Sequence, residues 1–197
     1  MLKTEIEILK RCKHENIITY IDHYENSKKV YIICDVIAGG DLNSFLTNSK
    51  KLLHESSVKQ LISQIGQALK YLHANGIIHR DIKPANIMIL PIAEAYGVRI
   101  VYKLIDFGLS KLLFRNETSD DRLGTVSFTA PEVLLGKKYS YKCDVWSLGI
   151  LLYFLTSGLL PFEGKNEKAT IESITKKKFI FTEHFKNNLL KLDEINC

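Results

Sequence analysis

The stretch of sequence that decides the fold is His-Arg-Asp-Ile-Lys-Pro-Ala-Asn, residues 79–86. It places a carboxylate at Asp81, an ammonium group at Lys83 and a carboxamide at Asn86 within one short loop. Transfer of a phosphoryl group needs these groups, because a carboxylate accepts the proton of the attacking hydroxyl, a cation neutralises charge and a carboxamide oxygen ligates Mg²⁺. Taken singly, Asp81 and Asn86 would be ordinary turn or loop residues, but their joint spacing favours the chemical role.

A second carboxylate motif follows this loop. Asp106-Phe107-Gly108 begins twenty residues after Asn86, directly after the apolar run 100–105. A carboxylate in this place is a hard oxygen ligand of the kind that Mg²⁺ prefers. The two motifs together therefore predict a single site for phosphoryl transfer.

The apolar periodicity upstream of these motifs predicts a helix and a hairpin. From Leu2 to Leu9 apolar residues recur at helical spacing, which predicts an amphipathic helix of about three turns. Residues 17–24 and 29–37, rich in Ile, Val and Tyr, predict two strands joined by a polar turn. Gly39-Gly40 then marks a junction, after which the period becomes helical.

The remainder of the chain predicts a mainly helical body. Its expected elements are a long helix with an apolar stripe over 58–72 that ends at Asn75-Gly76, strands at 87–90 and 100–105 separated by 91–99, a loop over 115–122, a buried helix over 144–155, a weaker amphipathic pattern over 167–176 and a polar tail.

Composition excludes several classes of protein. The 197 residues are 46% hydrophobic and 25% charged with net charge +5, which is typical of a globular domain and not of a disordered one. No apolar run reaches the roughly 18 to 20 residues that span a bilayer, and the first residues do not form a signal peptide. The lysines are scattered, which argues against nucleic-acid binding. The four cysteines are widely spaced, which favours a reducing, cytoplasmic location over disulfides or a metal site.

Two further motifs complete a resemblance to the eukaryotic protein kinases that covers nearly the whole chain. Residues 124–132 resemble the family's substrate-docking segment, with Phe128 where the family usually has Tyr. Residues 144–149 resemble the start of its central helix, whose Asp braces the catalytic loop. Four motifs in the family's order and spacing make the resemblance specific.

This resemblance implies an α+β, protein-kinase-like fold: one partial kinase domain over 1–197, with a small-lobe remnant at 1–37 (helix C plus a β-hairpin), a hinge or linker at 38–41 and a mainly helical large lobe at 42–197. Lys83 resembles the serine/threonine class. Residues 39–42 and 141–153 are similar to calcium/calmodulin-dependent and calcium-dependent kinases, although the 197 residues contain no EF-hand loop.

The resemblance also implies roles for particular residues, with ATP and Mg²⁺ as cofactors and proteins with Ser or Thr acceptors as substrates. Catalysis is assigned to Asp81, Lys83 and Asn86, and Mg²⁺ to Asn86 and Asp106. The ATP site is assigned to Asp106, to Glu5 as the partner of the family's ATP-holding lysine, to Cys34 beside the adenine as a small core residue, and to the main chain from Asp35 to Ile37.

An activation segment is expected to order without phosphorylation. Arg80 and Lys111 resemble residues that hold a phosphate in the family, and Asp121, four residues before Thr125, would take the place of that phosphate with help from Asp120. The alternative is that both Asp residues are merely solvated and that Thr118 or Ser119 is phosphorylated.

Two acidic residues are candidates for substrate binding. Asp41 and Glu172 match carboxylates with which relatives bind an Arg near the phosphoacceptor, whereas Ala85 replaces a third acidic partner. We therefore expect a moderate preference for one upstream Arg. The alternative is that Asp41 caps the helix that follows it.

One part of the family's machinery does not occur within these residues. The 197 residues contain no Gly-rich phosphate loop and no strand lysine before the first helix. We therefore expect negligible phosphotransfer by these residues alone. Two interpretations follow: a piece of a serine/threonine kinase, which the intact Asp81 and Asp106 favour, or a pseudokinase-like binding or scaffold protein.

Overall fold

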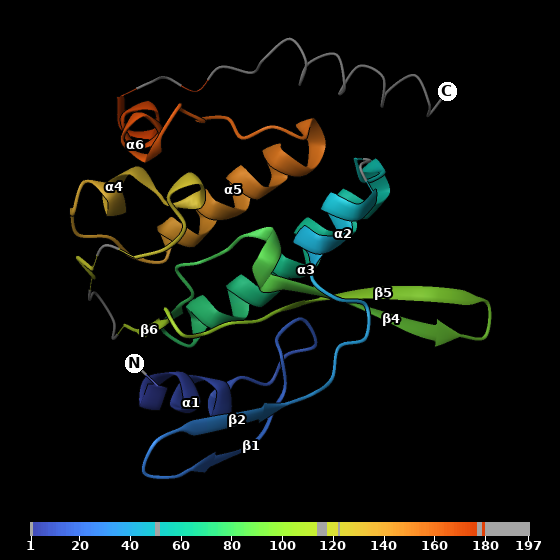
Figure 1. The fold of residues 1–197 in the computed structure, drawn as a ribbon. Helices are drawn as coiled ribbons and strands as arrows, with labels where there is room; N and C mark the ends of the chain where they lie inside the picture. The colour runs from blue at the N-terminus through green and yellow to red at the C-terminus, as the bar shows by residue number, and fades with distance from the viewer. Residues whose placement is uncertain (1, 50–51, 114–117, 122, 177–178, 180–197) are drawn as a thin grey trace.

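A computed structural model describes residues 2–49, 52–113, 118–121, 123–176 and 179. Figure 1 shows one hairpin and a short helix at one end of the molecule, with the remaining helices stacked beyond them. The elements in chain order are α1 (Leu2–Arg11), β1 (Tyr20–Glu25), β2 (Val30–Cys34), α2 (Leu42–Ser49), α3 (Glu55–Ala74), β3 (Ile77–Ile78), a 3₁₀ turn (Pro84–Asn86), β4 (Ile87–Glu94), β5 (Gly97–Leu104), β6 (Lys111–Leu112), a second 3₁₀ turn (Val126–Phe128), α4 (Pro131–Leu134), α5 (Lys142–Ser157) and α6 (Glu167–Lys176).

The structure confirms the predicted helices at both ends of the described chain and the hairpin. Helix α1 buries Ile6, Ile8 and Leu9, whereas Leu2 at its start is 52% exposed, and β1 pairs antiparallel with β2. Helix α3 buries its apolar stripe and ends at Asn75, after which Gly76 takes a left-handed φ of 70°. Within the predicted loop over 115–122, the described Ser119 forms an isolated bridge with Tyr139, and the predicted polar tail lies outside the described residues.

The prediction for the second hairpin was too short. Strands β4 and β5 pair without interruption from Ile87 opposite Leu104 to Glu94 opposite Gly97, and the ladder includes Pro91. Ile89 directs its N–H and C=O away from β5, to Gly40 and Gly39. Because such groups alternate along a strand, the missing N–H of Pro91 also faces away from β5 and costs the ladder nothing.

The largest hydrophobic core joins the two ends of the molecule. It contains Ile8 and Leu9 of α1, Ile65 and Leu72 of α3, and Leu151 of α5, each no more than 3% exposed. Helix α5 was predicted to be buried all round, and this is wrong in part, because Val145 is 56% and Leu152 40% exposed. None of the described helices is both long enough and apolar enough to cross a membrane.

The segment between β2 and α2 crosses β4 at close range. The Gly39 amide donates to the Ile89 carbonyl oxygen at 2.9 Å, and a Cβ at position 39 would lie 2.2 Å from that oxygen. Only glycine fits this crossing without a shift of the backbone, which explains the junction at Gly39-Gly40.

We predict opposite effects for two glycine substitutions. Gly39→Ala should lower the free energy of unfolding by about 2 kcal/mol or more, because either the linker or β4 must move. Gly66→Ala is the matched control, since no heavy atom lies within 4 Å of its added Cβ inside α3, and it should stabilise by up to about 1 kcal/mol. Denaturant unfolding measures both, and equal midpoints for the two variants would contradict the crossing as described.

Candidate active site

A buried carboxylate on α5 fixes the backbone of the loop at 79–86. Asp144 is 0% exposed and accepts hydrogen bonds from the amides of His79 (3.0 Å) and Arg80 (2.8 Å), while His73 Nε2 lies 2.8 Å from its Oδ2. Arg80 has φ of 72°, a conformation that is strained for any residue except glycine. The hydrogen bonds from the His79 and Arg80 amides to Asp144 hold Arg80 in this conformation.

His79 is a structural residue. Its ring packs edge-on against the Phe107 ring, with 5.0 Å between the ring centroids. Burial lowers the pKa of His79, which favours the neutral ring. Nε2 then donates to the Ile105 carbonyl oxygen at 3.1 Å, while Nδ1 accepts from the Asp81 amide at 3.3 Å. His79 thereby connects the loop that carries Asp81 with the segment that carries Asp106.

Four donors surround the carboxylate of Asp81, which is 6% exposed. Oδ2 lies 2.7 Å from Lys83 Nζ and accepts from Asn86 Nδ2 at 2.9 Å. Oδ1 accepts from the Thr125 amide at 3.2 Å and the Thr125 hydroxyl at 3.1 Å. Burial disfavours the charged form, but Lys83, Thr125 and Asn86 outweigh it and hold the pKa of Asp81 below its usual range.

Asp106 and Glu5 form a region of negative charge beside this cluster. Asp106 is exposed, has φ of 62° and accepts from the Gly108 amide at 3.1 Å. Burial and the charge of Asp106 raise the pKa of Glu5, and no ion pair involves Glu5 within the described ranges. Two carboxylates without a paired cation suit a hard divalent ion that also binds water and phosphate. The Ile105 amide, directly before Asp106, donates to the main-chain oxygen of Asn86 at 2.9 Å, which joins the two segments.

No group of three or more His, Cys, Asp or Glu side chains in the described part of the chain is arranged to hold a metal ion. At phosphate-transfer sites Mg²⁺ commonly completes its coordination with water and phosphate oxygens.

The segment assigned to adenine is tied down by a lysine that sequence reasoning missed. Asp35 Oδ1 accepts from the Thr19 amide at 2.8 Å, and its Oδ2 lies 3.1 Å from Lys103 Nζ. Lys103 also donates to the Ile17 carbonyl oxygen at 3.2 Å. Cys34 precedes this segment, half-buried at the end of β2, and burial together with Asp35 raises its thiol pKa.

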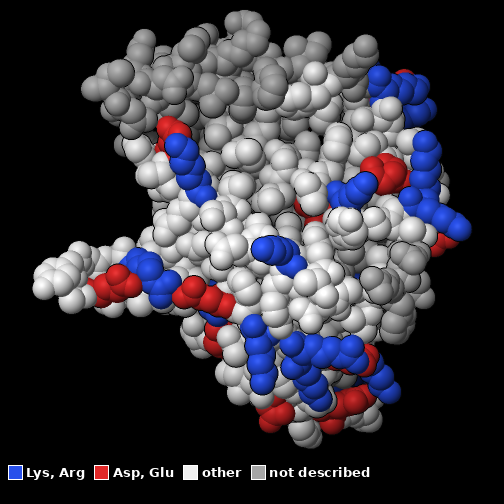
Figure 2. All heavy atoms as spheres, turned by 180° about the vertical axis from the view of Figure 1, so that it is seen from behind, with Lys and Arg blue, Asp and Glu red and all other residues white. Residues whose placement is uncertain are grey.

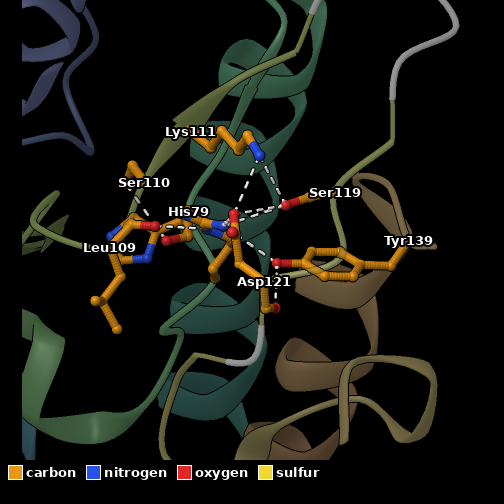
Figure 3. A network of polar contacts seen from close by, with 8 residues as sticks. His79, Leu109, Ser110, Lys111, Ser119, Asp121 and Tyr139 are labelled. Atoms are coloured by element: carbon orange, nitrogen blue, oxygen red, sulfur yellow. Dashed lines mark hydrogen bonds and ion pairs between the residues drawn. The ribbon is translucent and has the colours of Figure 1, made fainter. Parts of the chain in front are cut away.

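The structure brings Arg80, Lys111 and Asp121 together. Figure 3 shows Lys111, Ser119 and Tyr139 around Asp121. Asp121 Oδ2 lies 2.8 Å from Arg80 NH1 and 3.1 Å from Lys111 Nζ, and it accepts from the Ser119 hydroxyl at 2.8 Å. These donors hold the pKa of Asp121 well below its usual range, with Ser119 making the largest contribution. Asp120, which was expected to assist, forms no ion pair in the described ranges.

Two members of this network were not predicted. Tyr139 accepts from Arg80 NH1 at 3.1 Å and donates its hydroxyl to the Asp121 carbonyl oxygen at 2.9 Å. Ser119 and Tyr139 also exchange two backbone hydrogen bonds of 2.9 Å. Because Ser119 is 1% exposed with its hydroxyl bonded, a kinase cannot reach it in this conformation. No local sequence signal indicates Tyr139, which lies 59 residues from Arg80.

One candidate substrate-binding residue directly precedes α2 and the other lies on α6, and Figure 1 shows these two helices at opposite sides of the helical body. Asp41 precedes α2, where its carboxylate accepts from the Ser44 amide at 2.8 Å and the Ser44 hydroxyl at 2.7 Å, as a capping residue does. Glu172 is exposed on α6 and pairs with Lys176 at 2.7 Å. The structure does not bring them together.

The family model of the protein kinase domain matches residues 1–195, and the chain belongs to this family. Calcium-dependent protein kinase 4 of Plasmodium berghei (strain Anka) and of Plasmodium falciparum (isolate 3D7) are each 36% identical over 180 residues, which cover 91% of this chain and 33% of those proteins. Calcium-dependent protein kinase 5 of Plasmodium berghei is 34% identical over 197 residues, covering 100% of this chain and 34% of that protein. The chain thus spans about a third of the length of these relatives.

We predict that Asp121 stabilises the fold and that Asp120 does not. Asp121→Asn should lower the free energy of unfolding at pH 7 by about 1 kcal/mol, a value discounted because its side chain is 44% exposed. Its folded pKa is depressed, so the stabilisation is present above the unfolded pKa of about 3.9 and is lost as pH falls below that value.

Urea unfolding of wild type, Asp121→Asn and the control Asp120→Asn between pH 7 and pH 3 measures this difference. The gap between wild type and Asp121→Asn should stay constant down to about pH 4 and then shrink. Identical curves for the two variants would be inconsistent with the ion pairs described.

Proposed function

We propose that this chain belongs to a protein serine/threonine kinase that transfers the γ-phosphoryl group of ATP to Ser or Thr hydroxyls of protein substrates. The observation that carries the proposal is the set of donors around Asp81, in which Lys83, Asn86 and Thr125 all lie within 3.2 Å of one carboxylate. A buried carboxylate with only a structural role does not need an ammonium group, a carboxamide and a hydroxyl group around it.

Asp81 would act on the acceptor hydroxyl of the substrate. Its low pKa keeps it ionised near neutral pH, so it can accept a hydrogen bond from that hydroxyl, orient it and receive its proton. The Thr125 hydroxyl donates to Oδ1 of Asp81 in this structure and would share that oxygen with the substrate hydroxyl. Lys83 lies between Asp81 and Thr125, where its charge would stabilise the negative charge on the transferring group.

Asn86 and Asp106 would hold Mg²⁺. Asn86 donates with Nδ2 to the main-chain and carboxylate oxygens of Asp81, which leaves its carbonyl oxygen as the ligand. Burial and then the charge of Asp106 raise the pKa of Glu5, and a cation bound beside Asp106 would lower it again. When bound, Mg²⁺ supplies charge neutralisation for the phosphates of ATP.

The adenine would contact the main chain from Asp35 to Ile37, beside Cys34, and Glu5 would pair with the lysine that holds ATP in relatives. The proposed division into a small-lobe remnant at 1–37, a linker at 38–41 and a large lobe at 42–197 places this contact at the end of the remnant, directly before the linker. The ion pair between Lys103 and Asp35 supports the proposal, because it fixes the position of Asp35.

Asp121 would keep the activation segment ordered without a phosphate. Arg80 and Lys111 already pair with its carboxylate, and the Tyr139 hydroxyl donates to its main-chain oxygen. The carboxylate of Asp121 would therefore occupy the place of the phosphate. Thr125 would then be placed beside Asp81 whether or not an upstream enzyme has acted. The exposed Thr118 remains the alternative site of phosphorylation.

Substrate preference remains a prediction. The contacts of Asp41 with Ser44 support the capping alternative, although a carboxylate can accept further hydrogen bonds from a substrate Arg. Glu172 would supply a second contact. The calcium-dependent kinases among the relatives suggest such a kinase here, with a cytoplasmic location expected.

A phosphotransfer assay separates an enzyme from a scaffold. The 197-residue chain is compared with the same chain extended at its N-terminus by a Gly-rich loop and lysine-bearing strand of the protein kinase family, each with Mg²⁺-ATP and a Ser peptide. We expect turnover only in the extended protein, because positioning of the phosphates needs both missing parts.

Asp81→Asn in the extended protein should reduce turnover by about 10² to 10⁴, and Asp120→Asn should leave it unchanged. Turnover by the unextended chain that Asp81→Asn abolishes would show that the added parts are dispensable. An extended protein that binds Mg²⁺-ATP without turnover would support the scaffold alternative.

A further inference from the structure

A cavity of about 470 Å³ opens between the end of α1 and the start of β1. Its apolar lining consists of Leu9, Cys12 and Ile17, which are themselves almost fully covered, and of the partly exposed Ile18 and Tyr20, and Lys103 also lines it. None of the residues assigned above to catalysis, ATP, Mg²⁺ or substrate lines this cavity. The proposed reaction therefore does not account for it.

Two uncompensated positive charges lie on its rim. Lys10 and Lys13 are exposed and form no ion pair among the residues that the structure describes, and Lys10 Nζ lies 5.7 Å from the centre of the Tyr20 ring. The acidic lining residue, Glu15, is already paired with Arg99 at 2.8 Å. Figure 2 shows Lys and Arg side chains at the end of the molecule that contains α1, with Asp and Glu side chains among them.

The walls of the cavity are held in place by contacts of their own. Lys103 is fixed by Asp35 and the Ile17 carbonyl oxygen. Asn16 donates to Gln64 Oε1 at 2.7 Å and to the Tyr102 carbonyl oxygen at 3.0 Å, which anchors the turn after α1 to the helical body. A site that is already formed loses little entropy on binding.

We propose that this cavity binds an acidic segment of a partner protein that carries an apolar side chain. The apolar side chain would lie against Ile18 and Tyr20, the partly exposed apolar residues of the lining, where burial of its surface is favourable. Carboxylates next to it would pair with Lys10 and Lys13 at the rim, where electrostatic attraction also directs the approach. Two lysines beside an apolar opening suit such a segment better than a nucleic acid, which needs an extended basic face.

The test uses a fluorescein-labelled peptide with a Phe-Leu pair between glutamates, and fluorescence anisotropy on the full 197-residue chain. No nucleotide is present, so the result does not depend on the proposed kinase activity. A second probe replaces Phe-Leu by Ser-Ser. Lys10→Gln with Lys13→Gln removes the rim charges, and the matched control Lys28→Gln with Lys29→Gln removes two exposed charges from the turn between β1 and β2.

We expect the first probe to bind the wild type, more weakly at higher salt, and the Ser-Ser probe to bind far less. Loss of both rim lysines should raise Kd by about 5-fold to 30-fold, as for two partly exposed ion pairs. The control variant should stay within about twofold.

Either of two results with the first probe would overturn the proposal: no anisotropy change with the wild type, or equal weakening of binding in the two double variants. Equal binding of the Ser-Ser probe, or of a labelled single-stranded oligonucleotide used as a further probe, would also overturn it. All four substituted side chains are exposed, and circular dichroism verifies that each variant is folded. A cavity that binds acid without apolar preference is a general anion patch and not the site proposed.

Discussion

The buried carboxylate of Asp144 is the contact on which the geometry of the site depends. This carboxylate is fully buried. It accepts hydrogen bonds from two backbone amides of the loop at 79–86 and lies within hydrogen-bond distance of a ring nitrogen of His73. A buried charge is costly unless its hydrogen bonds are satisfied, so the loop and the carboxylate stabilise each other. The strained left-handed backbone of Arg80 persists because Asp144 holds it.

Arg80 then links the parts of the site that are distant in sequence. Its backbone precedes Asp81, while its guanidinium contacts Asp121 and Tyr139. The segment that carries Asp121 also supplies Thr125, which donates to Asp81. One residue in an unfavourable conformation thus couples the position of Asp81 to the segment that carries Asp121 and Thr125.

Sequence reasoning succeeded where the controlling signal is local. The apolar stripe of α3, the hairpin and the spacing of Asp81, Lys83 and Asn86 are properties of short windows, and the structure contains the predicted elements. It failed where contacts between distant segments decide the outcome. Pro91 lies within a strand because Gly39 and Gly40 occupy the other edge, and Tyr139 acts through a fold that no window of sequence reveals.

Native-state hydrogen exchange of an Asp144→Asn variant tests the central claim most directly. We expect the amides of His79 and Arg80 to exchange at least about tenfold faster relative to α3, because one acceptor oxygen is lost. The Ser119 and Tyr139 amides should accelerate with them, since Arg80 connects the two regions. Faster exchange at His79 and Arg80 with no change at Ser119 and Tyr139, or no change at any of the four, would contradict the account.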